Sequence, residues 1–260
     1  MTKAAIDALR AEHAHALDLF DSLTDAEWAA ASACAGWRVQ DVAQHMAATF
    51  HLIADAASIE KGDSGKSEVD AEVPVQARRD WTVAQVKAEY REWSEKGIAS
   101  LAAMQEPPMA EMVVPINDLG SHPLHLLANA IVFDHYCHLR HDIGGAVRRA
   151  ADLPHDPLAL ETSIEWMMAG APQMCAEALQ PLRVGVNFVF TDLQHVTYRL
   201  VRAAGDGPWE VHEGTDNHHP VAVTSAHEFI SWATKRDDWR THTQLTDEAA
   251  AATLDALNII

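Results

Sequence analysis

The sequence predicts an α+β protein in which an antiparallel four-helix bundle, residues 1–180, precedes a small α+β domain with a short antiparallel sheet, residues 181–260. Apolar residues recur at helical spacing in long segments of the first part, as expected for a helical bundle. After Pro181, apolar and polar residues alternate in short runs separated by turns, which is typical of strands. A length of 260 residues also favours two domains.

Several segments of the first part carry the helical period. They are residues 4–22, 36–58, 81–104, 122–143 and 157–179. Residues 61–80 are polar and interrupted by Gly and Pro, so we expect a long loop there, of the kind that often forms a lid. Pro123 is expected in the first turn of the helix over 122–143, and Gly144 at its C-terminal end.

The second part shows strand alternation in RVGVNFVFTD and HVTYRLVRAAGDGPWEVHEG, with a shorter strand at residues 221–223. Ser225 and Glu228 form a capping box that begins a helix, and Thr246 precedes the last helix. These elements together predict the small mixed domain.

The composition argues against two classes of partner. The chain has 38 acidic and 19 basic residues, and a formal net charge of −19 repels nucleic acids and anionic membrane surfaces. No run of about 18 apolar residues predicts a transmembrane helix, and the first residues lack the basic start and apolar run of a signal peptide. We therefore expect a cytoplasmic protein, either a monomer or a homodimer.

The three cysteines are isolated in the sequence, so neither a disulfide framework nor a zinc knuckle is expected. Cys34 and Cys175 are interpreted as buried thiols that behave as small apolar residues. Cys137 adjoins His138, but on a helix its side chain faces away, which favours a place in the core.

A candidate metal site lies on the segment HPLHLLANAIVFDHYCHLRHDI, residues 122–143. Asp134 and His138 are four residues apart, so one helical turn brings them to the same face, and His141 shares that face. Their neighbours are too apolar to bury a carboxylate without a partner. His45, on the helix over 36–58, is the leading candidate for a third ligand. A structural histidine held by hydrogen bonds is the alternative interpretation.

The segment GWRVQDVAQHMA, residues 36–47, resembles a signature of the DinB-like and mycothiol-dependent maleylpyruvate isomerase superfamily. That signature, Gly-Trp-(Thr/Ser)-Val-x-Asp-(Val/Leu)-x-x-His, leads to a metal ligand, and the matching residue is His45. A second element of the family, Glu-x-x-x-His, corresponds to Asp134 and His138. The C-terminal HEFISWATKRDDW resembles the domain appended in actinobacterial members.

Three residues depart from the family pattern. Arg38 replaces a hydroxyl residue and is expected to weaken the helix cap. Asp134 replaces Glu, which shortens the ligand by one methylene, and His141 could compensate as a fourth ligand. The spacing from His138 to Asp142 is one residue longer than the family's His-x-x-Asp.

The resemblance implies a metal-dependent thiol transferase or isomerase. Two histidines and a carboxylate suit Zn²⁺, with Ni²⁺ or Fe²⁺ as alternatives. The cosubstrate would be mycothiol or a similar low-molecular-weight thiol, and the substrate a small electrophile, expected to be anionic. Arg236, preferred over Arg240, would hold the anion. Two other functions stay open, namely a metal-binding protein without turnover and a metal-dependent hydrolase in which His141 or His135 is the general base.

Overall fold

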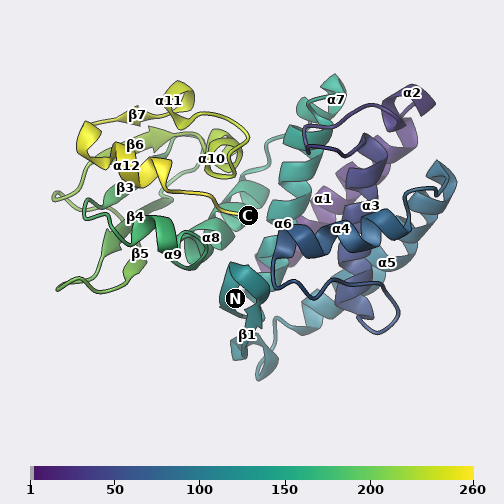
Figure 1. Ribbon diagram of the computed structural model, residues 1–260, viewed down its shortest axis with the longest axis horizontal. Helices are drawn as coiled ribbons and strands as arrows, with labels where there is room; N and C mark the ends of the chain where they lie inside the picture. The colour runs from purple at the N-terminus through teal and green to yellow at the C-terminus, as the bar shows by residue number, and fades with distance from the viewer. Residues whose placement is uncertain (1–2) are drawn as a thin grey trace. The chain divides into compact units, whose positions relative to one another are not determined.

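The computed structural model describes residues 3–260, and the chain divides into two compact units after Pro154. Each unit has its own arrangement of helices and strands (Figure 1). The sequence analysis placed the division after residue 180. In the structure the helix over 157–174 belongs to the second unit rather than to the bundle. That helix packs on a strand and a helix of the second unit, which explains its place there.

The N-terminal unit is mainly helical. Its elements are α1 (Lys3–Ser22), α2 (Asp25–Trp28), α3 (Val39–Ala54), α4 (Ser67–Ala77), α5 (Val83–Ala103), η1 (Met109–Glu111), β1 (Val113–Ile116), η2 (Asn117–Leu119), β2 (Gly120–Pro123), α6 (Leu126–Cys137), η3 (His138–Ile143) and α7 (Arg148–Ala151). Helix α3 packs on α5, and α1 packs on both α5 and α6. The aromatic rings of Phe20, Phe50 and Tyr90 meet in the core, with Tyr90 fully buried.

Two local expectations for this unit are wrong. Helix α4 occupies part of the segment 61–80 that was expected to be a loop. It is stabilised by tertiary packing on α3, which buries Val75 and which propensity alone does not reveal. Pro123 ends strand β2, and the helix begins only at Leu126.

The C-terminal unit is built around a five-stranded sheet. Its elements are α8 (Pro157–Met174), α9 (Ala176–Leu179), β3 (Val186–Phe190), β4 (Thr197–Arg202), β5 (Trp209–Glu213), β6 (Val221–Thr224), α10 (Ala226–Ala233), α11 (Trp239–His242), β7 (Gln244–Leu245), η4 (Glu248–Ala250) and α12 (Ala251–Asp255). The strand order is β5-β4-β3-β6-β7. The pair β3–β6 is parallel and the other pairs are antiparallel.

An aromatic core holds the C-terminal unit together. Phe188 and Phe190 on β3 meet Phe229 on α10, and Phe229 meets Trp232 at ring-centroid distances of 4.8–5.4 Å. The hydroxyl of Ser225 accepts a hydrogen bond from the Glu228 N–H, so the predicted cap begins α10. The α+β fold expected from the sequence is confirmed.

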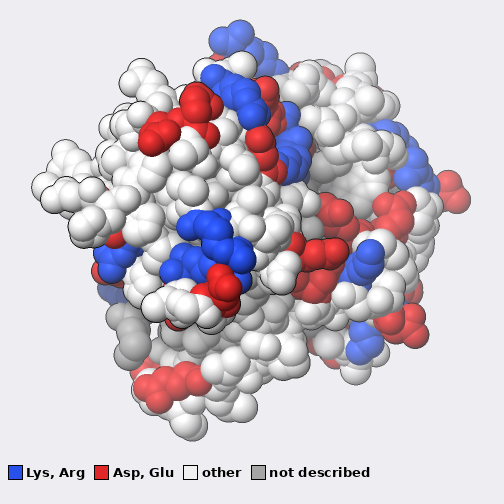
Figure 2. Space-filling view, turned by 60° about the vertical axis from the view of Figure 1, so that its left-hand side comes forward, with Lys and Arg blue, Asp and Glu red and all other residues white. Residues whose placement is uncertain are grey.

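Within residues 3–260, the structure contains no helix of the length and apolar character that a membrane span requires. On the face shown in Figure 2, Lys and Arg side chains lie in small groups between Asp and Glu side chains. The charge on that face is therefore mixed in sign.

Candidate metal centre

The start of α3 positions His45. The backbone N–H of Arg38 donates to Asp41 Oδ2 at 2.8 Å, while the Arg38 guanidinium pairs with the same carboxylate at 2.8 Å. Arg38 makes no side-chain hydrogen bond as an N-cap, so Asp41 alone caps this end by accepting from the backbone. Two turns later His45 lies with its ring 5.4 Å from that of Trp37, which limits the orientation of the imidazole.

Three side chains from two segments converge at one carboxylate oxygen. Asp134 Oδ1, on α6, is 3.1 Å from His45 Nε2 and 3.3 Å from His138 Nε2. The two imidazole rings are 4.9 Å apart and nearly perpendicular. The three ligand-capable atoms lie within 4.8 Å of one another. Two imidazoles and a carboxylate at this separation are a donor set that suits zinc.

The second carboxylate oxygen of Asp134 is buried and accepts no hydrogen bond. His135 Nδ1 lies 3.4 Å from it, but that nitrogen is 3.0 Å from the Ile131 carbonyl oxygen. The other nitrogen of His135 is 3.0 Å from the Tyr90 hydroxyl. Burying a carboxylate oxygen without a hydrogen bond destabilises the folded protein. A cation bound at Asp134 would offset this cost, which the neighbouring side chains do not.

The pKa values of Asp134 and His138 are shifted in opposite directions. Burial raises the pKa of Asp134, but the charge of His138 and hydrogen bonds from the surrounding histidines outweigh it and hold that pKa well below its usual range. Burial lowers the pKa of His138, but the Asp134 charge and hydrogen bonds outweigh it and raise that pKa well above the usual range. A metal ion at His138 would therefore have to displace a proton.

A π-helical turn, η3, follows Asp134 and carries His138 at its first residue. The N–H of Gly144 donates to the Leu139 carbonyl five residues earlier at 3.1 Å, as in a π turn. Asp142 Oδ2 lies 2.7 Å from His138 Nδ1. The wider turn accommodates the one additional residue between histidine and aspartate, so Asp142 can orient the imidazole as partners of metal-binding histidines do.

His141 belongs to neither cluster of ligand-capable residues found within residues 3–260. Its ring lies 6.4 Å from that of Tyr136. The prediction that His141 shares a face with Asp134 and His138 assumed α-helical spacing. The π turn at His138–Ile143 changes that spacing. Asp142, the next residue, is the one that contacts the His138 imidazole, at Nδ1.

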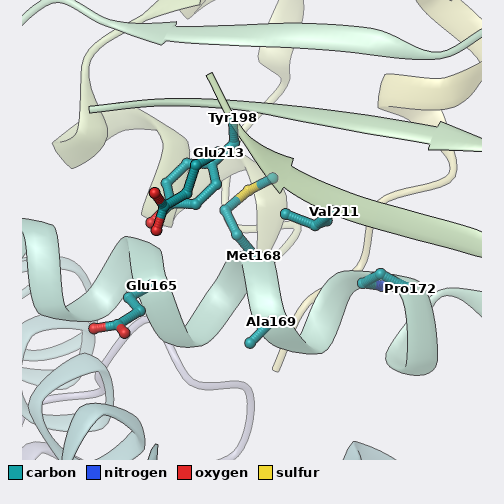
Figure 3. Close-up of a pocket in the computed structure, with 7 residues that line it drawn as sticks. All are labelled: Glu165, Met168, Ala169, Pro172, Tyr198, Val211 and Glu213. Carbon is teal, nitrogen blue, oxygen red and sulfur yellow. The ribbon is translucent and has the colours of Figure 1, made fainter. Parts of the chain in front are cut away.

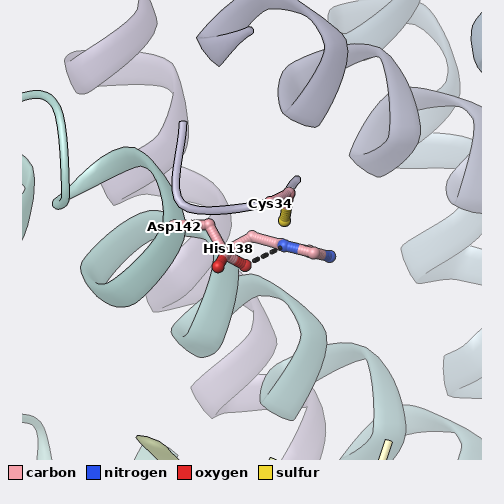
Figure 4. Close-up of side chains that lie close together, drawn as sticks. All are labelled: Cys34, His138 and Asp142. Carbon is pink, nitrogen blue, oxygen red and sulfur yellow. Dashed lines mark hydrogen bonds and ion pairs between the residues drawn. The ribbon is translucent and has the colours of Figure 1, made fainter. Parts of the chain in front are cut away.

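Cys34 is the residue that sequence reasoning missed. It is partly exposed rather than buried, and it lies beside His138 and Asp142 (Figure 4). The loop that carries it is attached to the π turn, because the Ala33 N–H donates to the Asp142 carbonyl at 3.0 Å. Its place depends on this long-range contact, and no local sequence signal indicates it. Cys137 is 2% exposed, in agreement with its predicted place in the core.

A family model described as the mycothiol maleylpyruvate isomerase N-terminal domain matches residues 9–144, more than half of the chain. The chain belongs to this family. The matched residues include Cys34 and the cluster of His45, Asp134 and His138, called the first cluster below. The resemblance inferred from residues 36–47 is therefore confirmed at the level of the family.

Two solved structures share the fold of this family member. One is the crystal structure of the mycothiol-dependent maleylpyruvate isomerase, with 12% identity, a TM-score of 0.54, and coverage of 93% of this chain and 91% of that chain. The other is a histidine-to-alanine mutant of that enzyme, with 12% identity, a TM-score of 0.51 and the same coverage. No curated protein matches the sequence.

The arginine predicted to hold an anion lies in the C-terminal unit of this family member. Arg236 follows α10 and is exposed, and its backbone N–H donates to the Ser231 carbonyl at 3.0 Å. Arg240 makes a bidentate ion pair with Asp255 at 2.8 and 2.9 Å. The preference for Arg236 over Arg240 comes from the sequence alone, and the role of Arg236 stays a prediction.

A cavity of about 290 Å³ lies in the C-terminal unit between α8 and the strands β4 and β5 (Figure 3). Its lining residues are Glu165, Met168, Ala169, Pro172, Tyr198, Val211 and Glu213. Burial, helped by the charges of nearby glutamates, raises the pKa of Tyr198 to about 12. The cavity therefore has a neutral phenol and acidic side chains, and the predicted metal ligands do not line it.

Proposed function

We propose that the protein is a metal-dependent isomerase or transferase that uses mycothiol, or a similar low-molecular-weight thiol, on a small anionic electrophile. The observation that carries the proposal is the convergence of His45, Asp134 and His138 beside a buried carboxylate oxygen without a hydrogen bond. Family membership supports mycothiol as the cosubstrate, because the matching family model is described as the mycothiol maleylpyruvate isomerase N-terminal domain.

The residues that would hold the ion are His45, Asp134 and His138. Zinc is the preferred ion, and nickel or iron(II) would accept the same donors. A zinc ion held by three protein ligands supplies a Lewis acid with an open position, which lowers the pKa of a bound thiol or water.

The protein side chains have separate tasks in this proposal. Asp142 accepts a hydrogen bond from the Nδ1–H of His138 and so would present Nε2 to the cluster. Asp134 supplies the negative charge that balances a cation. Arg236 would bind the carboxylate of the substrate through its guanidinium, which is suited to bidentate recognition.

An assay with zinc-loaded protein, mycothiol and maleylpyruvate tests the proposal. We expect isomerisation that requires the thiol and that is lost in His45→Ala. Arg236→Ala is expected to raise KM by about tenfold, the loss of one charge-assisted hydrogen bond, whereas Arg240→Ala should leave KM unchanged. If the loaded protein turns over no thiol–electrophile pair, the function is metal binding without catalysis.

A further inference from the structure

The imidazole of His138 has a carboxylate at each of its nitrogens. Nε2 lies 3.3 Å from Asp134 Oδ1, in the cluster described above, and Nδ1 lies 2.7 Å from Asp142 Oδ2. A metal ion can bind either nitrogen of a neutral imidazole, and the other nitrogen then carries the proton. Whichever nitrogen binds, the remaining one has a carboxylate to accept its proton and orient the ring.

A thiol stands on the Asp142 side of the ring. The sulfur of Cys34, a nitrogen of His138 and a carboxylate oxygen of Asp142 all lie within 4.8 Å of one another. Figure 4 shows Cys34 extending from its loop toward the imidazole, with Asp142 on the π turn. The side chain of Asp142 is 1% exposed, so its charge is almost completely removed from water.

We propose that Cys34, His138 and Asp142 form a second metal position, which takes a divalent ion with affinity for thiolates, such as zinc or cobalt. Thiolate, imidazole and carboxylate are all zinc ligands, and the thiolate favours softer ions over magnesium or calcium. Binding displaces the proton of the Cys34 thiol and the proton between His138 Nδ1 and Asp142. Two protons leave and one dication enters.

The backbone around Cys34 holds the thiol in place for this role. The Cys34 N–H donates to the Ser32 hydroxyl at 3.2 Å, and the Cys34 carbonyl accepts from the Trp37 N–H at 3.0 Å. The hydrogen bond from Ala33 to the Asp142 carbonyl joins this loop to the π turn that supplies the other two ligands. Partial exposure of Cys34 gives an ion access that the buried Cys137 and Cys175 lack.

The second position shares the ligand His138 with the site of the proposed function, and Asp142 contacts that imidazole in both, but each position also has a ligand of its own that mutation can remove. His45 belongs to the first cluster alone, and Cys34 belongs to the second alone. His45→Ala therefore weakens the first position and leaves the three ligands of the second intact. Cys34→Ser has the reverse effect.

The test is a titration of the metal-free full-length chain with Co²⁺, followed by absorption spectroscopy and metal analysis. A thiolate ligand to cobalt produces a charge-transfer band in the near ultraviolet. We expect His45→Ala to bind one cobalt ion with this band, and the double variant His45→Ala/Cys34→Ser to lose the band. The matched control His45→Ala/Cys175→Ala should keep it, because the Cys175 sulfur accepts from the Asn258 N–H elsewhere in the chain.

Circular dichroism establishes whether each variant is folded. If Cys34→Ser does not fold, Asp142→Asn tests the second position instead. In the His45→Ala background, Asp142→Asn removes a carboxylate ligand of the second position and should lower the affinity for the thiolate-bound cobalt ion at least tenfold. A folded His45→Ala protein that binds cobalt without the thiolate band would overturn the second position. The second position would also be overturned if wild type bound cobalt without the thiolate band and His45→Ala bound no cobalt. That result would leave the proposed function intact.

Discussion

Two charged clusters of the N-terminal unit, one around Arg140 and one around Asp134, differ in how completely their buried polar atoms are hydrogen-bonded. Arg140, in the π turn, donates to both oxygens of Glu12 at 2.6 and 2.9 Å, and both side chains are fully buried. Its guanidinium also lies 4.0 Å from the centroid of the Tyr136 ring. Asp134 instead has one buried oxygen that accepts no hydrogen bond.

The difference indicates separate roles for the two clusters. A buried ion pair with all its hydrogen bonds made has nothing left to offer a ligand, and removing one partner leaves an uncompensated charge. An incompletely satisfied carboxylate between two imidazoles has capacity for a cation. Stability should therefore depend on Glu12 and Arg140, and metal affinity on Asp134 and its histidines.

The largest expected effect is on stability. Glu12→Gln leaves Arg140 buried without its counter-charge and should lower the free energy of unfolding by about 3–5 kcal/mol. Denaturant unfolding of the metal-free protein measures it. The control Glu92→Gln removes an exposed partner of Lys96 and should leave stability close to that of wild type. Equal stability of the two variants would refute the structural role of Glu12.

The same pair predicts a dependence on pH. Burial alone raises the pKa of Glu12, but His15 and Arg140 outweigh it and lower the pKa below its ordinary 4.5. A lowered pKa contributes stability above pH 4.5, and that contribution is lost as the pH falls through the folded value. The stability gap between wild type and Glu12→Gln should therefore be complete at neutral pH and shrink in acid. A gap that widens in acid would contradict the assignment.

A smaller effect is expected beside the metal cluster. Asp142→Asn weakens the orientation of His138 and should lower the affinity for the tightest-bound zinc by about 10- to 100-fold. Competition with a chromogenic chelator measures the affinity. Asp152→Asn is the matched control, because Asp152 pairs with Arg148 on the surface. Indistinguishable affinities for the two variants would remove Asp142 from the site.

The smallest effect is expected at His141, which belongs to neither cluster within residues 3–260. His141→Ala should leave zinc affinity unchanged in the same competition assay. A loss as large as that of Asp142→Asn would show that His141 reaches the ion after all, as the sequence alone allowed.

The sequence predicted the helices and the three converging residues because helical periodicity and the motif of residues 36–47 are local signals. It missed helix α4, which depends on packing against α3. It also missed the π turn at His138–Ile143, which accommodates the one extra residue between His138 and its partner Asp142. Cys34 reaches the site through a contact far along the chain, which spacing cannot reveal.

The most direct test of the metal centre is zinc competition on metal-free wild type and His45→Ala, with unfolding measured on the same samples. His45 contributes to the first cluster only, and its Nε2 lies 3.1 Å from Asp134 Oδ1. The convergence of the three side chains predicts at least a tenfold loss of affinity for the tightest zinc, with stability largely kept. Equal zinc affinity in the two proteins would contradict it.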